Sequence, residues 1–155
     1  MGSAFPVRHV AALLALAIVA MPAGAIVRGT TDSGRDFVSG GVGSEEMEAI
    51  NAERSRYALA VLTAAKGSGA FLSDVHVRIA DAHESQVLDT VMDGPWLLVD
   101  LPPGRYTITA TLNGQVQKTS LSLGNSGRRQ ATFYFDTHDE IEPAGADHTV
   151  TEGPP

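Results

Sequence analysis

Cysteine is absent from this sequence of 155 residues. The absence excludes disulfide bridges, thiolate zinc sites, iron–sulfur clusters and cysteine nucleophiles. The glycine-rich motifs of nucleotide-binding loops and the Gly-x-Ser-x-Gly motif of serine hydrolases are absent as well. The sequence thus lacks these common short motifs of catalysis and cofactor binding, and none of its residues is predicted from them to be catalytic or to bind a cofactor.

Positive charge is also scarce. The chain has 11 lysines and arginines against 18 acidic residues, a formal net charge of −7. The acids are concentrated at the C-terminal end, where residues 136–155 hold six of them and no lysine or arginine. Without a basic stripe to collect phosphates, nucleic-acid binding is not expected. We interpret residues 136–155 as a disordered acidic tail.

Long apolar segments are missing beyond the first 25 residues. Residues 1–25 begin with a basic stretch that contains Arg8, continue with an apolar run over 10–21 and end in an Ala-x-Ala pattern. This pattern is typical of a secretory signal peptide, here cleaved after Ala25. The run is shorter than the roughly 20 apolar residues that span a bilayer. We therefore predict a periplasmic or secreted chain without a membrane span, which must be stable without disulfides.

Between the predicted signal peptide and the first predicted strand, residues 26–56 divide into two parts. Residues 26–43 are rich in glycine, serine and threonine and have no sustained period, so we predict a flexible linker. Residues 44–56 favour a short amphipathic helix, with Ser44 as the N-cap and acidic residues in the first turn. Met47 and Ile50 share one face of that helix, which packs either on the following domain or on a partner.

The strands are predicted from alternation and turn residues. Tyr106, Ile108 and Ala110 alternate with threonines, the period of a strand with one buried face. Asn113-Gly114 is the strongest short signal for a β-hairpin. Seven short strands at such spacing indicate an all-β, Greek-key sandwich over residues 57–135. They are expected near 57–64, 74–80, 86–92, 96–101, 102–112, 115–123 and 131–135.

One segment carries a family resemblance. The stretch Asp93 to Ala110, with LPPGRYTITA at Leu101–Ala110, resembles the carboxypeptidase regulatory-like domain, a member of the transthyretin-like (prealbumin-like) β-sandwiches. The stretch Gly40 to Ala64 resembles the N-terminal part of small exported proteobacterial proteins that carry such a domain and have no assigned activity. The resemblance implies a transthyretin-like sandwich with Tyr106 in its core. It implies little about function, because this sandwich hosts many roles.

Candidate sites for chemistry are weak. The histidines at positions 76, 83, 138 and 148 do not have a metal-ligand spacing. Most of the aspartates at 74, 81, 89, 93 and 100 fall at strand ends and turns, where their own backbone hydrogen bonds favour them. We predict no catalytic residue, no metal and no cofactor. The candidate binding surfaces are an exposed edge strand and a set of five side chains: Met47, Ile50, Arg54, Trp96 and Tyr134.

These observations favour a non-enzymatic exported module that binds another protein of the cell envelope. A carbohydrate- or cell-wall-binding module is the alternative, with Trp96 and Tyr134 as aromatic side chains that stack on a sugar ring. A hydrolase of the transthyretin type is a third possibility. Such hydroxyisourate hydrolases carry a Tyr-Arg-Gly-Ser signature, which this sequence does not contain.

Overall fold

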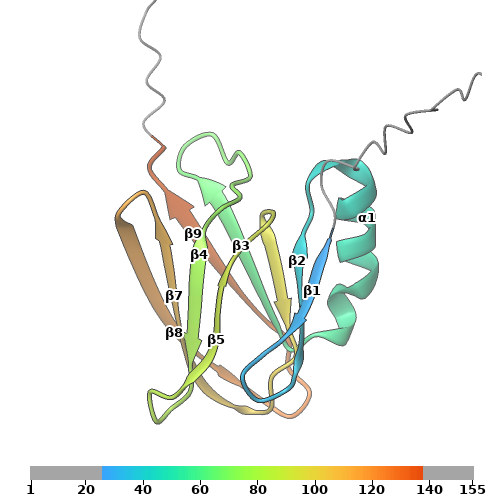
Figure 1. The fold of residues 1–155 in the computed structure, drawn as a ribbon, viewed down its shortest axis with the longest axis vertical. Coiled ribbons are helices and arrows are strands. Elements are labelled where there is room, and N and C mark those ends of the chain that lie inside the picture. The colour runs from blue at the N-terminus through green and yellow to red at the C-terminus, as the bar shows by residue number, and fades with distance from the viewer. Residues whose placement is uncertain (1–25, 138–155) are drawn as a thin grey trace, which may run out of the picture.

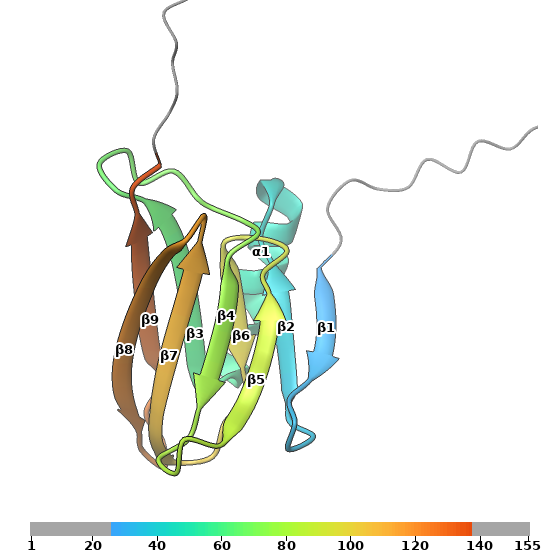
Figure 2. The same cartoon turned by 60° about the vertical axis from the view of Figure 1, so that its left-hand side comes forward.

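The structure, a computed structural model, describes residues 26–137. In this part of the chain, nine strands form two sheets that pack face to face, and one short helix lies on the outside (Figures 1 and 2). The larger sheet has the order β1-β2-β6-β3-β9 and the smaller sheet has the order β5-β4-β7-β8. The strands are β1 (Val27–Thr30), β2 (Asp36–Gly40), β3 (Leu59–Ala65), β4 (His76–Ala80), β5 (Gln86–Val91), β6 (Trp96–Val99), β7 (Gly104–Leu112), β8 (Gln115–Leu123) and β9 (Arg129–Phe135).

The mostly β, two-sheet architecture predicted from the sequence is confirmed. The seven predicted strands correspond to β3–β9, and their ends are shifted by at most two residues. Most neighbours pair antiparallel, whereas β3 and β9 pair in parallel over their full length. The main core lies between the sheets and contains the inward side chains of the alternating strands, such as Val77, Ile79 and Ile108.

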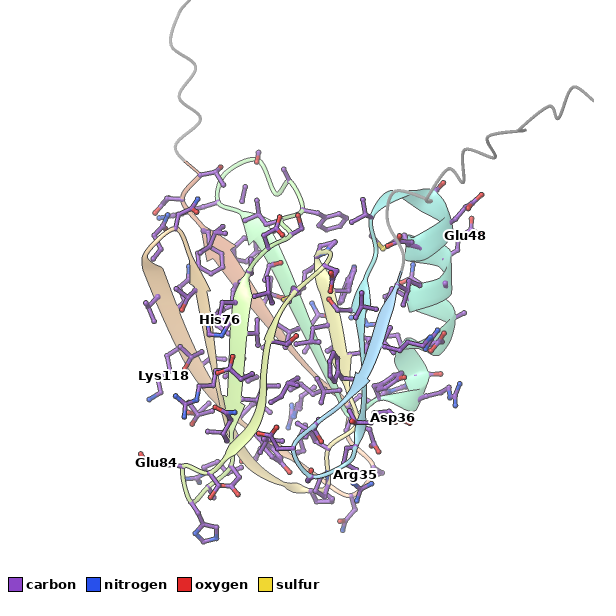
Figure 3. The ribbon with its side chains drawn as sticks, in the orientation of Figure 1. Arg35, Asp36, Glu48, His76, Glu84 and Lys118 are labelled. Carbon is purple, nitrogen blue, oxygen red and sulfur yellow. The ribbon has the colours of Figure 1, made fainter. Side chains whose placement is uncertain are left out.

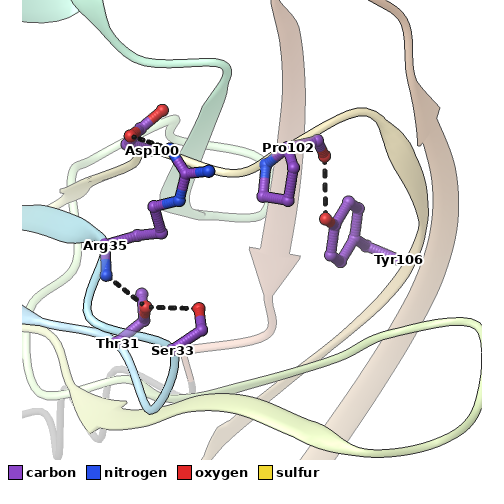
Figure 4. Close-up of polar contacts among 6 residues, drawn as sticks. All are labelled: Thr31, Ser33, Arg35, Asp100, Pro102 and Tyr106. Carbon is purple, nitrogen blue, oxygen red and sulfur yellow. Dashed lines mark hydrogen bonds and ion pairs between the residues drawn. The ribbon is translucent and has the colours of Figure 1, made fainter.

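The predicted count of seven strands and the predicted linker over 26–43 are both corrected, because β1 and β2 lie in that interval. The turn between them is closed by Thr31, whose hydroxyl accepts the backbone N–H of Arg35 at 3.0 Å and contacts the Ser33 hydroxyl at 3.1 Å (Figure 4). β2 then pairs with β6, which places Val38 opposite Leu98. This pairing partner is distant in sequence, so no local period reveals the strand.

The helix predicted over 44–56 is present as α1 (Gly43–Glu53), followed by one 3-10 turn (Arg54–Arg56). The predicted cap is corrected, because Ser44 lies inside the helix and the N-cap residue is Val42. The Glu46 carboxylate accepts the backbone N–H groups of Gly41 and Val42, both at 3.0 Å, and so satisfies donors at the helix start.

The segment LPPGRY forms the corner between β6 and β7. Tyr106 is buried in the main core, as predicted, and its hydroxyl donates a hydrogen bond to the Pro102 carbonyl at 2.8 Å (Figure 4). Burial raises the pKa of this hydroxyl, which therefore stays a donor. A tyrosine hydroxyl that bonds the backbone a few residues upstream is the contact known from tyrosine corners of β-sandwiches.

Two predictions fall on residues that the structure does not describe: the signal peptide over 1–25 and most of the acidic tail, 138–155. Within residues 26–137, none of the helical segments has the length and hydropathy needed to cross a membrane.

Candidate functional site

The predicted binding surface is corrected at two of its five positions. Ile50 and Trp96 are only 1% and 6% exposed, because they pack with Val38 and Leu98 between α1 and the outer face of the larger sheet. Met47 packs at the border of the same cluster and is partly buried. The helix thus uses its apolar face on the sandwich itself, one of the two arrangements expected from the sequence, and does not present this face to a partner.

Arg54 and Tyr134 are the remaining two positions. The Arg54 guanidinium lies 4.3 Å from the centre of the Trp96 ring and donates a hydrogen bond to the Gln130 side chain. Tyr134 lies on β9 and is 53% exposed. The structure therefore joins Met47, Ile50, Trp96 and Arg54 in one packed unit and leaves Tyr134 outside it. Because Trp96 is buried, it does not form an exposed aromatic pair with Tyr134.

The edge strands are the other candidate surface, and the β9 edge is partly closed. Two glutamine side chains of β8 reach across to it. Gln117 donates to the Tyr134 carbonyl, while Gln115 donates to the Asp136 carbonyl at 2.6 Å and accepts the Asp136 N–H at 3.1 Å. These side chains replace a neighbouring strand for part of β9 and so protect the edge from further pairing.

Two other edges are also short or partly covered. β1 has only four residues. At β5, the backbone N–H of Asp32 donates to the Val87 carbonyl at 2.9 Å, and the Gln86 side chain donates to the Asp32 carboxylate at 3.2 Å. The turn between β1 and β2 therefore covers the start of the β5 edge.

The β8 edge differs from the other three. β7 and β8 pair over nine residues without a register shift, and the turn between them has positive φ at Asn113 (48°) and Gly114 (79°). In a two-residue hairpin of this kind, the flanking residues Leu112 and Gln115 exchange backbone hydrogen bonds. The odd-numbered residues of β8 therefore bond to β7, and the backbone groups of the even-numbered residues point outward: Val116, Lys118, Ser120 and Ser122.

These outward groups are unpaired within the described residues, since no hydrogen bond to them is found there. The side chains of β8 do little to block the edge. Lys118 is the only charged residue of the strand, and it lies opposite Thr109 on the outer face of the smaller sheet (Figure 3). Val116 is 65% exposed, and Leu121 is half-buried at the border of the main core. β8 contains neither proline nor a bulge, two of the devices that prevent strand addition, and Lys118 is the one charged side chain that could act in this way.

Other exposed polar groups within the described residues include a close histidine–aspartate pair. His76 and Asp89 form a pair at 2.5 Å on the outer face of the smaller sheet. Across residues 26–137, no three His, Asp or Glu side chains are placed to hold a metal ion. The chain was compared with protein-family models, curated proteins and solved structures, and none of the three comparisons gave a match.

Proposed function

We propose that this protein is a non-enzymatic, exported β-sandwich that binds another protein of the cell envelope by pairing a strand of that partner with β8. The observation that supports this proposal is the row of outward backbone groups on β8. The other three sheet edges, by contrast, are short or partly covered. Main-chain hydrogen bonds supply affinity in such strand addition, and side-chain pockets supply specificity.

The chemistry of the partner strand follows from the two faces of β8. On the inner face, the added strand would cover Thr119 and Leu121, which are half-buried now, so apolar residues fit there. On the outer face it would lie beside Val116, Lys118 and Ser120. A partner segment with alternating apolar and polar residues, with an acid near Lys118, matches this edge.

Export and family membership belong to the same proposal. Export is supported by the signal-peptide pattern of residues 1–25. A transthyretin-like, Greek-key fold related to carboxypeptidase regulatory-like domains is supported by the motif LPPGRYTITA and by the contact between Tyr106 and Pro102. Sugar binding through stacked aromatics has less support, because Trp96 lies beneath α1.

The test uses a photo-crosslinking amino acid at position 118 or 122 in cells that export the intact protein. We expect both positions to give an adduct with the same envelope protein, whereas position 84, in the turn between β4 and β5, gives none. A second variant, Ser120→Pro, removes one outward N–H that the fold itself does not use. It should keep the circular dichroism spectrum and lose the adduct.

Ser120→Ala is the matched control, because it removes the hydroxyl and keeps the N–H, and it should retain the adduct. Thr119→Pro tests the register, since it removes an N–H that bonds β7 and should unfold the hairpin. Adducts that form equally well with Ser120→Pro, or from position 84, would rule out strand addition at β8.

A further inference from the structure

A cleft of about 400 Å³ lies where the 3-10 turn after α1 meets the start of β9. Three arginines line it: Arg54 from the 3-10 turn, Arg128 from the residue before β9, and Arg129 from the first residue of β9. It lies on the outer side of the larger sheet, whereas β8 belongs to the smaller sheet, so its role is independent of the strand-pairing function proposed above.

The guanidinium groups of Arg54 and Arg128 are held in place by neighbouring groups, and within the described residues none of the three arginines of the cleft is neutralised by an ion pair. Arg54 is held against the Trp96 ring and bonded to Gln130, and Arg128 donates to the Ser55 carbonyl at 3.1 Å. A guanidinium has five donors, so most of these donors remain available. The four ion pairs within the described residues involve Arg28, Arg35, Lys66 and His76, and none of them uses an arginine of the cleft.

The helix end explains only part of this arrangement. A cation near the last turn of a helix compensates the helix dipole, which accounts for Arg54. Arg128 and Arg129 come from a different element and are not needed for that purpose. Tyr57 also lines the cleft. The planar guanidinium forks of arginine suit carboxylate groups.

The same chain supplies a segment of opposite charge. Residues 138–155 contain Asp139, Glu140, Glu142, Asp147 and Glu152 and no lysine or arginine. The described chain ends at Thr137, just beyond the far end of β9 from the cleft; Figure 1 shows β9 running away from the lower end of α1. A return along this strand of seven residues covers roughly 23 Å at about 3.3 Å per residue.

The number of residues between Thr137 and each of the five acids decides which of them can contact the cleft. Asp139 and Glu140 lie two and three residues beyond Thr137, and an extended chain spans at most about 3.6 Å per residue, so neither of them reaches the cleft, and Glu142, five residues beyond Thr137, would reach it only with backbone and side chains fully extended. Asp147 lies ten residues beyond Thr137, and Glu152 fifteen, so both reach it. We propose that Asp147 and Glu152 bind the arginine cleft of their own chain. Tethering to the same chain raises their effective concentration at the cleft above that of a free peptide.

The test uses paramagnetic relaxation in the intact protein. Because the sequence contains no cysteine, Thr149→Cys gives a single attachment point for a spin label between the two acids. We expect the label to broaden the amide signals of residues 54–57 and 128–130 more than those of the outer face of β4. This preference should be lost at 1 M salt, where charge interactions are screened beyond about 3 Å.

The variants separate binding from random encounters. Asp147→Asn with Glu152→Gln should abolish the preferential broadening, and so should Arg128→Gln with Arg129→Gln. Asp139→Asn with Glu140→Gln changes the net charge equally and should leave it intact. The proposal is overturned if the broadening has no preference for the cleft or if both acid pairs behave alike. It is also overturned if broadening arises only between molecules in a mixture of labelled and isotope-enriched chains.

Discussion

The two sheets of this protein differ in how many of their faces are covered. The larger sheet packs on the main core with one face and beneath α1 with the other, and its strands β3 and β6 are buried at nearly every position. The smaller sheet packs on the core with one face only, and β4 alternates between exposed and buried residues. The apolar run LAVLTAA and the alternating run HVRIA report this difference directly in the sequence.

The two faces of the larger sheet pack against hydrophobic clusters of unequal size. The main core between the sheets contains 17 buried apolar residues, and the cluster beneath α1 contains five. A small cluster that is closed by one short helix can relax when a side chain is removed, whereas the main core is enclosed by two sheets. Stability should therefore depend more on the face that both sheets share than on the face that only α1 covers.

Leu97 and Leu98 give the largest test, since they are neighbours on β6, are fully buried and point to opposite faces. Leu97→Ala should cost about 3–5 kcal/mol and Leu98→Ala about 2–3 kcal/mol, because the cavity penalty falls where the surroundings can collapse. Urea unfolding followed by circular dichroism measures both. Equal losses, or a larger loss for Leu98, would show that the helix face matters as much as the main core.

The β7–β8 hairpin tests the sheet that is covered on one face. Gly114 has a φ of 79°, so Gly114→Ala places a Cβ in the left-handed region and should cost about 1–2 kcal/mol. Gly124→Ala is the control, because a Cβ there meets nothing within 4 Å and the φ is not positive. That variant should be neutral or slightly more stable. Thermal unfolding compares the two, and similar midpoints would contradict the hairpin geometry.

A smaller effect is expected at the corner that connects the sheets. Tyr106→Phe removes the hydrogen bond to the Pro102 carbonyl and should cost about 0.5–1.5 kcal/mol. Tyr134→Phe, on the exposed outer side of the larger sheet, should change the free energy of unfolding by less than about 0.5 kcal/mol. If both variants unfold at the wild-type urea concentration, the corner contact does not contribute.

The smallest effect concerns the ion pair of Arg28 with Glu53, which ties β1 to the end of α1. The hydrogen bond from Arg28 lowers the pKa of Glu53 below its ordinary 4.5. Its stabilisation is therefore complete above about pH 4.5 and is lost as the pH falls through the folded-state value. Because both side chains are partly exposed, the loss should be about 0.2–1 kcal/mol.

Urea midpoints at pH 6 and pH 3 measure this loss, and Glu53→Gln should make the difference between them smaller. Glu48→Gln, on the exposed side of α1, serves as the control. An unchanged pH dependence in Glu53→Gln would mean that the ion pair does not stabilise the fold.

The sequence predicted those features that depend on residues close together in the chain, and it failed where distant segments meet. Alternation and the Asn-Gly turn located the turn between β7 and β8 to the residue, because side-chain period and turn φ are local properties. Trp96 was expected as a candidate surface residue, but it is buried, because α1 folds back over β6. The candidate edge could be anticipated only in general terms, since the position of β8 at the border of its sheet depends on the order of all four strands.

The sequence by itself determined the strands β3–β9, the helix and the corner at LPPGRY, because each depends on side-chain period or turn residues within a few positions. Only the tertiary structure decided the strands β1 and β2, because β2 pairs with β6 across nearly 60 positions and β1 pairs in turn with β2. It also gathered Arg54 with Arg128 and Arg129 and left the β8 edge open. These features arise where distant segments meet, and no local pattern records such a meeting.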